Sequence, residues 1–188
     1  MIYLASRLNL NHIHWIAPSA GHDRTWYPGV FMDPIAVNEP ALTQAIRQID
    51  YALERASDNG RLDSARLVTM GFSQGACLTA EYALRHPGRC KTMVILTGGL
   101  FGPAGTLWKG EPGMLAGTRA LITGSDVDEW IPESRVHETA NALRGFEAEV
   151  DVRIYQGRPH EVTEAELQEA ACLIRKIACS TDRQSGEG

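Results

Sequence analysis

Leu67-Val68-Thr69-Met70-Gly71-Phe72-Ser73-Gln74-Gly75-Ala76-Cys77-Leu78 is the stretch that decides the fold. An apolar run typical of a buried strand ends at Gly71, and an Ala- and Leu-rich pattern typical of a helix continues to His86. Between the two stands Gly-x-Ser-x-Gly. A strand-to-helix turn with an incidental serine would show the same five residues, but the flanking strand and helix favour a functional turn.

The functional interpretation rests on what a serine needs to react. Its hydroxyl is a weak nucleophile unless a base takes the proton, so the Ser73 oxygen must stand clear of the backbone. A sharp turn achieves this but strains the serine and crowds its flanks, which predicts that glycine is required at both Gly71 and Gly75. The turn also directs the Gln74 backbone N–H and the positive end of the following helix toward a developing oxyanion.

Length and composition predict one globular domain over residues 1–182, followed by a disordered tail at 183–188. The hydrophobic fraction is 44% and the charged fraction 22%, both ordinary for such a domain. A net charge of −5 offers no basic surface, so nucleic acid is not an expected partner.

Three further features predict a cytoplasmic location. No apolar run is long enough to cross a bilayer, so stable membrane insertion is not expected. The N-terminus resembles part of an amphipathic helix rather than a signal peptide. The four cysteines lie inside apolar patterns without metal-type spacing and are interpreted as reduced thiols, with no metal or organic cofactor expected.

Strand and helix patterns alternate along the chain and predict an α/β fold. A mostly parallel sheet would carry helices on both faces and functional loops at the carboxyl ends of its strands. Strands are predicted at Ile13–Ala17, Arg66–Gly71, Lys91–Thr97, Thr118–Thr123 and Glu149–Tyr155, the last nearer the sheet edge. Helices are predicted at Pro40–Ala56, Gln74–Arg85, Glu133–Arg144 and from a Thr163/Glu166 capping box to about Cys179.

A nucleophilic Ser73 requires a base, and three histidines follow it in the sequence. His86 is at the far end of the helix after Ser73, and His137 lies within a helix among charged residues. His160 follows the last predicted strand and precedes the last helix, the position expected of the base when the order is serine, acid, histidine. An exposed loop histidine is the plainer alternative.

The acid that would orient the base should follow the strand that ends at Thr123. The next loop offers Asp126, Asp128 and Glu129. Asp126 could accept the imidazole N–H or could merely bond loop amides in an Asx turn. Spacing does not distinguish these alternatives.

Six blocks of sequence, in order, make the chain resemble the phospholipase/carboxylesterase family of α/β-hydrolases from Ala5 to about Cys179. They are Trp26-Tyr27-Pro28, Asn38-Glu39-Pro40, Gly71-Phe72-Ser73-Gln74-Gly75-Ala76, Gly98-Gly99-Leu100, Ser125-Asp126-Val127-Asp128 with Ile131-Pro132, and Gly157-Arg158-Pro159-His160. The family includes acyl-protein thioesterases, lysophospholipases and small bacterial carboxylesterases. The resemblance implies that Ser73 is the nucleophile, His160 the base and Asp128, four residues before Pro132, the acid.

The chain departs from the family pattern in three places. Glu129 stands where proline is common, and Arg158-Pro159 replaces residues that are commonly small. The first strand of the family and its His-Gly-x-Gly loop, which supplies a second oxyanion N–H, have no counterpart here. We therefore expect an N-terminally truncated α/β-hydrolase.

The resulting prediction is a serine hydrolase that cleaves a small-molecule or lipid-like carboxylic ester or thioester through an acyl-enzyme. Trp26, Leu100, Phe101 and Trp130, all on loops, are candidate substrate-binding residues, with ordinary loop packing as the alternative. The sequence is compatible with a homodimer. One rival is a catalytically impaired remnant that acts as a binding or interaction domain. The other, a nucleotide-binding α/β domain, lacks any phosphate-binding glycine motif.

Overall fold

The computed structural model describes residues 2–11, 13–20, 24–57 and 63–182, with side chains described as far as residue 177. The tail predicted to be disordered, 183–188, lies outside the described residues. The elements are α1 (Ile2–Arg7), α2 (Ile35–Asn38), α3 (Ala41–Ala56), β1 (Val68–Phe72), α4 (Gln74–Arg85), β2 (Thr92–Leu96), β3 (Arg119–Ser125), α5 (Glu133–Gly145), β4 (Glu149–Tyr155) and α6 (Glu164–Asp182).

The four strands form one parallel sheet in the order β1-β2-β3-β4. The pairing of Phe72 with Leu96, and of Leu96 with Thr123, aligns the carboxyl ends of the strands along one edge. Loops that follow the strands therefore meet at that edge, where functional residues of parallel sheets collect. Strand β4 lies at one side of the sheet, as its alternating sequence predicts.

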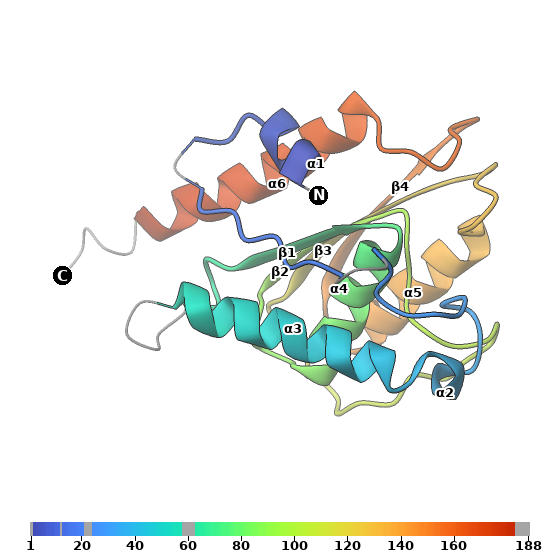
Figure 1. Ribbon diagram of the computed structural model, residues 1–188. Helices are drawn as coiled ribbons and strands as arrows, with labels where there is room; N and C mark the ends of the chain where they lie inside the picture. The colour runs from blue at the N-terminus through green and yellow to red at the C-terminus, as the bar shows by residue number, and fades with distance from the viewer. Residues whose placement is uncertain (1, 12, 21–23, 58–62, 183–188) are drawn as a thin grey trace.

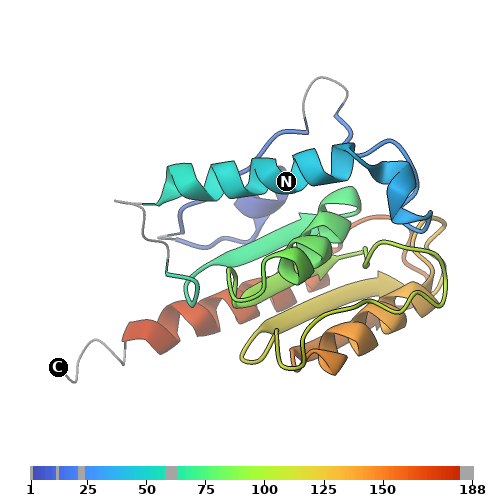
Figure 2. The same ribbon diagram turned by 90° about the horizontal axis from the view of Figure 1, so that it is seen from below.

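The sheet is the middle of three layers (Figures 1 and 2). Helices α1 and α6 cover one face, and α3, α4 and α5 lie on the other. Side chains of strand β2 belong to the hydrophobic clusters on both faces of the sheet. Met93 and Ile95 pack on the α4 side, and Val94 and Leu96 pack on the α6 side. Both faces of the sheet are thus buried, and the predicted α/β class is confirmed.

The strand predicted at Ile13–Ala17 is wrong. Residues 13–18 run without regular structure. Strands form by pairing, and in the described sheet β1 pairs only with β2, so this segment has no ladder partner. Ile13 instead packs as a single side chain against the apolar cluster under α6, while Trp15 and Ile16 remain about half exposed.

The predicted capping box at the start of α6 is confirmed. The Glu166 carboxylate accepts a hydrogen bond from the Thr163 backbone N–H at 2.8 Å, and the Glu166 N–H donates to the Thr163 hydroxyl at 3.4 Å. Glu166 is nevertheless fully buried, which a helix cap on the surface does not require. The Glu166 carboxylate also lies 3.4 Å from Arg158 Nε, with which it forms an ion pair.

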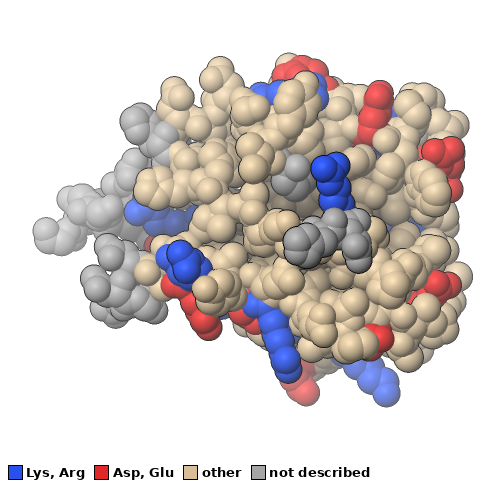
Figure 3. Space-filling view, viewed as in Figure 1, with Lys and Arg blue, Asp and Glu red and all other residues tan. Residues whose placement is uncertain are grey.

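Charged side chains of both signs are scattered over the face seen in Figure 3, with a wide uncharged area between them. No continuous basic area is visible on that face. Among the described residues, no helix combines the length and the apolar character needed to cross a membrane.

Candidate active site

Ser73 occupies a strained turn between β1 and α4. Its backbone has φ 54° and ψ −121°, and a positive φ is unusual for a residue other than glycine. A Cβ atom at Gly71 would lie 2.0 Å from the backbone oxygen of Gly75, so only glycine fits there. The matching prediction for Gly75 is wrong, because a Cβ atom at that position meets nothing within 4 Å.

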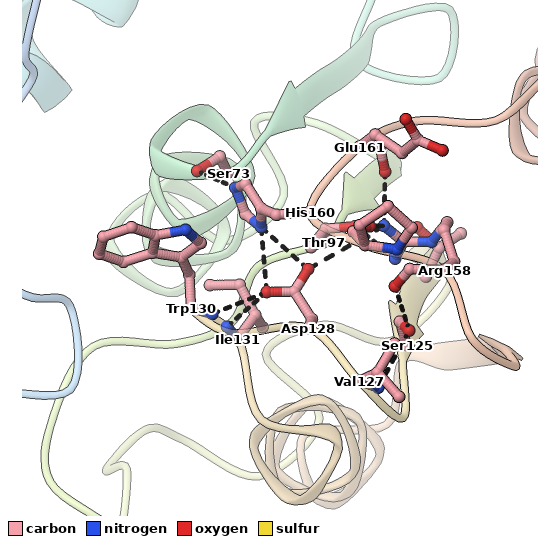
Figure 4. A network of polar contacts seen from close by, with 12 residues as sticks. Ser73, Thr97, Ser125, Val127, Asp128, Trp130, Ile131, Arg158, His160 and Glu161 are labelled. Carbon is pink, nitrogen blue, oxygen red and sulfur yellow. Dashed lines mark hydrogen bonds and ion pairs between the residues drawn. The ribbon is translucent and has the colours of Figure 1, made fainter.

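A continuous chain of hydrogen bonds joins Ser73, His160 and Asp128 (Figure 4). His160 Nε2 lies 2.9 Å from Ser73 Oγ, and His160 Nδ1 lies 3.0 and 2.9 Å from the two oxygens of Asp128. An ionised carboxylate only accepts, so Nδ1 carries the proton and Nε2 is free to accept one from the serine. The three residues follow β1, β4 and β3 respectively.

Asp128, rather than Asp126, is the carboxylate that the fold brings to His160. Asp128 Oδ1 also accepts the backbone N–H groups of Trp130 at 2.9 Å and Ile131 at 2.8 Å, and its side chain is fully buried. Asp126 instead accepts the Gly157 N–H at 2.7 Å and so ties the loop after β3 to the loop after β4.

The surroundings of Asp128 favour its ionised form. Burial alone would raise the pKa of this carboxyl, but the N–H groups of Ile131 and Trp130, followed by His160, outweigh burial and lower the pKa below its ordinary 3.8. A carboxyl with a lower pKa in the folded than in the unfolded chain stabilises the fold above its unfolded pKa. That contribution disappears as the pH falls through the folded pKa.

We therefore expect Asp128→Asn to cost stability in a pH-dependent way. The difference in the free energy of unfolding between wild type and variant should be largest near pH 6. It should shrink as the pH falls below about 4, where the carboxyl of the unfolded wild-type chain takes up a proton before that of the folded chain does. Urea unfolding of both proteins at several pH values measures it. A difference that stays constant down to pH 3 would contradict the described environment of Asp128.

Gln74 contributes through both its backbone and its side chain. It is the first residue of α4, where backbone N–H groups have no partner within the helix and the helix dipole is positive. Its side chain accepts the Trp26 N–H at 2.9 Å and donates to the Tyr27 carbonyl at 3.3 Å. The loop at 26–27 is thus fixed beside the serine turn.

The four candidate substrate-binding residues lie in different environments. Leu100 and Phe101 are fully buried, and the Phe101 ring packs edge-on against Tyr27 at 4.7 Å between centroids. Trp26 is partly buried at the loop held by Gln74. Trp130 is 62% exposed, which leaves its indole available to a bound molecule.

Sequence reasoning missed a polar cluster behind the histidine. It consists of Thr97, Ser125, Arg158 and Glu166, all of them buried. The one signal was Arg158 itself, a long charged residue at a position where small residues are common in the family. Spacing could not show that its guanidinium turns inward.

A parallel sheet covered on both faces, with a strained serine turn at the carboxyl ends of its strands, defines an α/β-hydrolase. A sequence profile of the Phospholipase/Carboxylesterase family matches residues 2–178, and the chain belongs to that family. Membership supports hydrolase activity of the esterase or phospholipase type on a small-molecule substrate. No curated protein matches the sequence significantly.

Solved structures agree with this assignment. A phospholipase/carboxylesterase from Dyadobacter fermentans is 31% identical, with a TM-score of 0.73 over 82% of this chain and 73% of that one. Arabidopsis thaliana SOBER1 is 15% identical, with a TM-score of 0.70 over 93% and 90% of the two chains. A Bacillus cereus carboxylesterase is 20% identical, with a TM-score of 0.63 over 79% and 68%. The last two are similar in fold.

Proposed function

We propose that the protein is a serine hydrolase that cleaves carboxylic esters or thioesters through an acyl-enzyme on Ser73. Ser73 Oγ attacks the acyl carbon while His160 Nε2 takes the hydroxyl proton. His160 then delivers that proton to the departing alcohol or thiol. A water molecule, deprotonated by the same nitrogen, releases the acid and restores the serine.

The observation that carries this proposal is the hydrogen-bond chain from Ser73 through His160 to Asp128. Both ring nitrogens of His160 are engaged at 2.9 to 3.0 Å, within the range expected of a nucleophile, its base and an orienting acid. The lowered pKa of Asp128 keeps it ionised at neutral pH, so that it stabilises the imidazolium formed during the reaction.

The Gln74 backbone N–H is the proposed oxyanion donor. It begins α4 immediately after Ser73, so it faces the carbonyl oxygen of an acyl group bonded to the serine. We further propose that Trp26 and Trp130 border the acyl group. Leu100 and Phe101 are too buried to be reached without movement, and their contribution is the apolar wall behind the site.

Reaction with a fluorophosphonate probe tests this function directly. A serine with an assembled base and acid attacks the probe phosphorus, displaces fluoride and becomes phosphonylated. We expect one adduct per chain, mapped by peptide mass spectrometry to Ser73, and protection by a short-chain ester. Ser64→Ala, which lies before β1 and so at the opposite end of that strand from the turn, serves as a control that should label normally. A folded chain that takes up no probe would refute the proposed function and favour a binding domain.

A further inference from the structure

The buried polar cluster behind His160 contains two charged side chains, Arg158 and Glu166, and adjoins a third, Asp128, and all three are almost completely isolated from solvent. The side chains of Asp128 and Glu166 are 0% exposed, and that of Arg158 is 3% exposed. Burying a charge is costly unless it is paired and hydrogen-bonded. One guanidinium between the two carboxylates provides the pairing, and Figure 4 shows it beside Asp128 on the side away from Ser73.

Arg158 uses its fork of donors to contact three loops and one helix. Nη2 donates to the Thr97 hydroxyl, after β2, at 2.8 Å. Nη1 lies 4.0 Å from Asp128 Oδ2, after β3, and also donates to the carbonyls of Pro159 and Glu161, after β4. Nε lies 3.4 Å from Glu166 Oε2 on α6.

The counter-charge Glu166 and the backbone of Arg158 are themselves held in place. Glu166 accepts the Thr123 hydroxyl at 2.7 Å and the Thr163 N–H, so its carboxylate has little freedom to rotate. The Arg158 carbonyl accepts the Ser125 hydroxyl at 2.5 Å. The guanidinium therefore sits in a rigid frame that reaches from the strand ends to α6.

Arg158 lies close to His160 in the sequence and contacts the loop that carries it. Arg158 precedes His160 by two residues, and its Nη1 bonds the carbonyls on either side of the histidine, at Pro159 and Glu161. The same nitrogen is paired with Asp128, the carboxylate that His160 must meet. A single side chain thus fixes both the loop that carries the base and the acid that orients it.

We propose that Arg158, with Glu166 as its counter-charge, is a positioning residue whose forked guanidinium holds the His160 loop against Asp128. The inference rests on the proposed function of the same site. Lysine could not replace it, because one ammonium cannot contact Thr97, two carbonyls and two carboxylates from a single point.

A merely structural arginine would lower stability when replaced and leave the histidine–aspartate bond unchanged in the folded protein. The discriminating observable is the His160 Nδ1–H proton, which a short bond to Asp128 protects from solvent and makes visible by proton NMR. Assignment comes from its absence in His160→Ala. This readout requires no enzymatic activity.

We expect Arg158→Met and Arg158→Lys each to lose this resonance, through solvent exchange at least about tenfold faster, at temperatures where circular dichroism shows a folded chain. The matched control is Arg135→Met, since Arg135 is 1% exposed and equally buried but lies on α5 and bonds the Leu100 carbonyl. That variant should lose stability and keep the resonance. Retention of the resonance in Arg158→Lys would show that the forked shape of the guanidinium is not needed. Retention in Arg158→Met would overturn the whole proposal.

Kinetics with a short-chain p-nitrophenyl ester provides the second readout. Misplacement of a base by a fraction of an ångström slows chemistry more than binding, so Arg158→Met should lower kcat about 10- to 100-fold with KM within about threefold of wild type. Suppose that wild type shows the resonance, that Arg158→Met lacks it, and that wild type never reacts with fluorophosphonate. That combination would refute the proposed function alone. A reactive wild type whose resonance and kcat survive Arg158→Met would refute the positioning role alone.

Discussion

Ser73→Ala is expected to abolish fluorophosphonate labelling, and Asp128→Asn to lower kcat by about three to four orders of magnitude. The alanine variant removes the atom that attacks. The asparagine variant keeps the size of Asp128 but loses the negative charge that accepts Nδ1–H and balances the imidazolium. His160→Ala should be as damaging as Ser73→Ala, because residues that act as a unit fail together.

Labelling rates and ester hydrolysis measure these losses, with thermal unfolding to show that each variant is folded. Asp126→Asn is the matched control in the same loop. It removes the charge of a carboxylate that bonds the Gly157 N–H rather than His160, and it leaves an oxygen that can still accept that N–H, so we expect a far smaller loss of kcat than Asp128→Asn causes. Equal losses in the two asparagine variants would contradict the assignment of Asp128 as the orienting acid.

Gly71→Ala is expected to destabilise the fold by more than about 3 kcal/mol, or to prevent folding altogether. The added Cβ would lie 2.0 Å from the Gly75 oxygen, 2.1 Å from the Gly75 carbonyl carbon and 2.5 Å from the Ala76 nitrogen. All three are backbone atoms of the first turn of α4, so no side chain can rotate away. Urea unfolding compares the variant with wild type.

Gly75→Ala is the control for that substitution, two residues beyond Ser73. Its Cβ would meet nothing within 4 Å, and alanine favours helix formation by up to about 1 kcal/mol over glycine. We expect stability equal to or above that of wild type. If Gly75→Ala were the more damaging of the two changes, the described approach of α4 to β1 would be wrong.

Local pattern was enough to predict most of the architecture. The helix Gln74–Arg85 and the strand Glu149–Tyr155 have the predicted bounds, because helical and strand periodicities extend to clear stops. The aligned carboxyl ends of a parallel sheet then place His160 near Ser73 although 87 positions separate them. Family resemblance pointed to Asp128 where spacing left Asp126 open.

What pattern could not predict depends on partners distant in sequence. Ile13–Ala17 has strand composition, but composition cannot create a neighbouring strand for it to pair with. Gly75 is flanked by open space that only the packing of α4 reveals. The inward turn of Arg158 depends on Glu166 and Thr97, which lie on separate elements.

The 87 positions between Ser73 and His160 also set an order of events during synthesis. At about 5 to 20 residues per second, a ribosome needs about 4 to 17 seconds to travel from the codon for the serine to that for the histidine. Throughout that interval the nascent chain carries the serine without its base. Under the proposed mechanism, the growing polypeptide stays inert toward esters until β4 and the loop after it have been made.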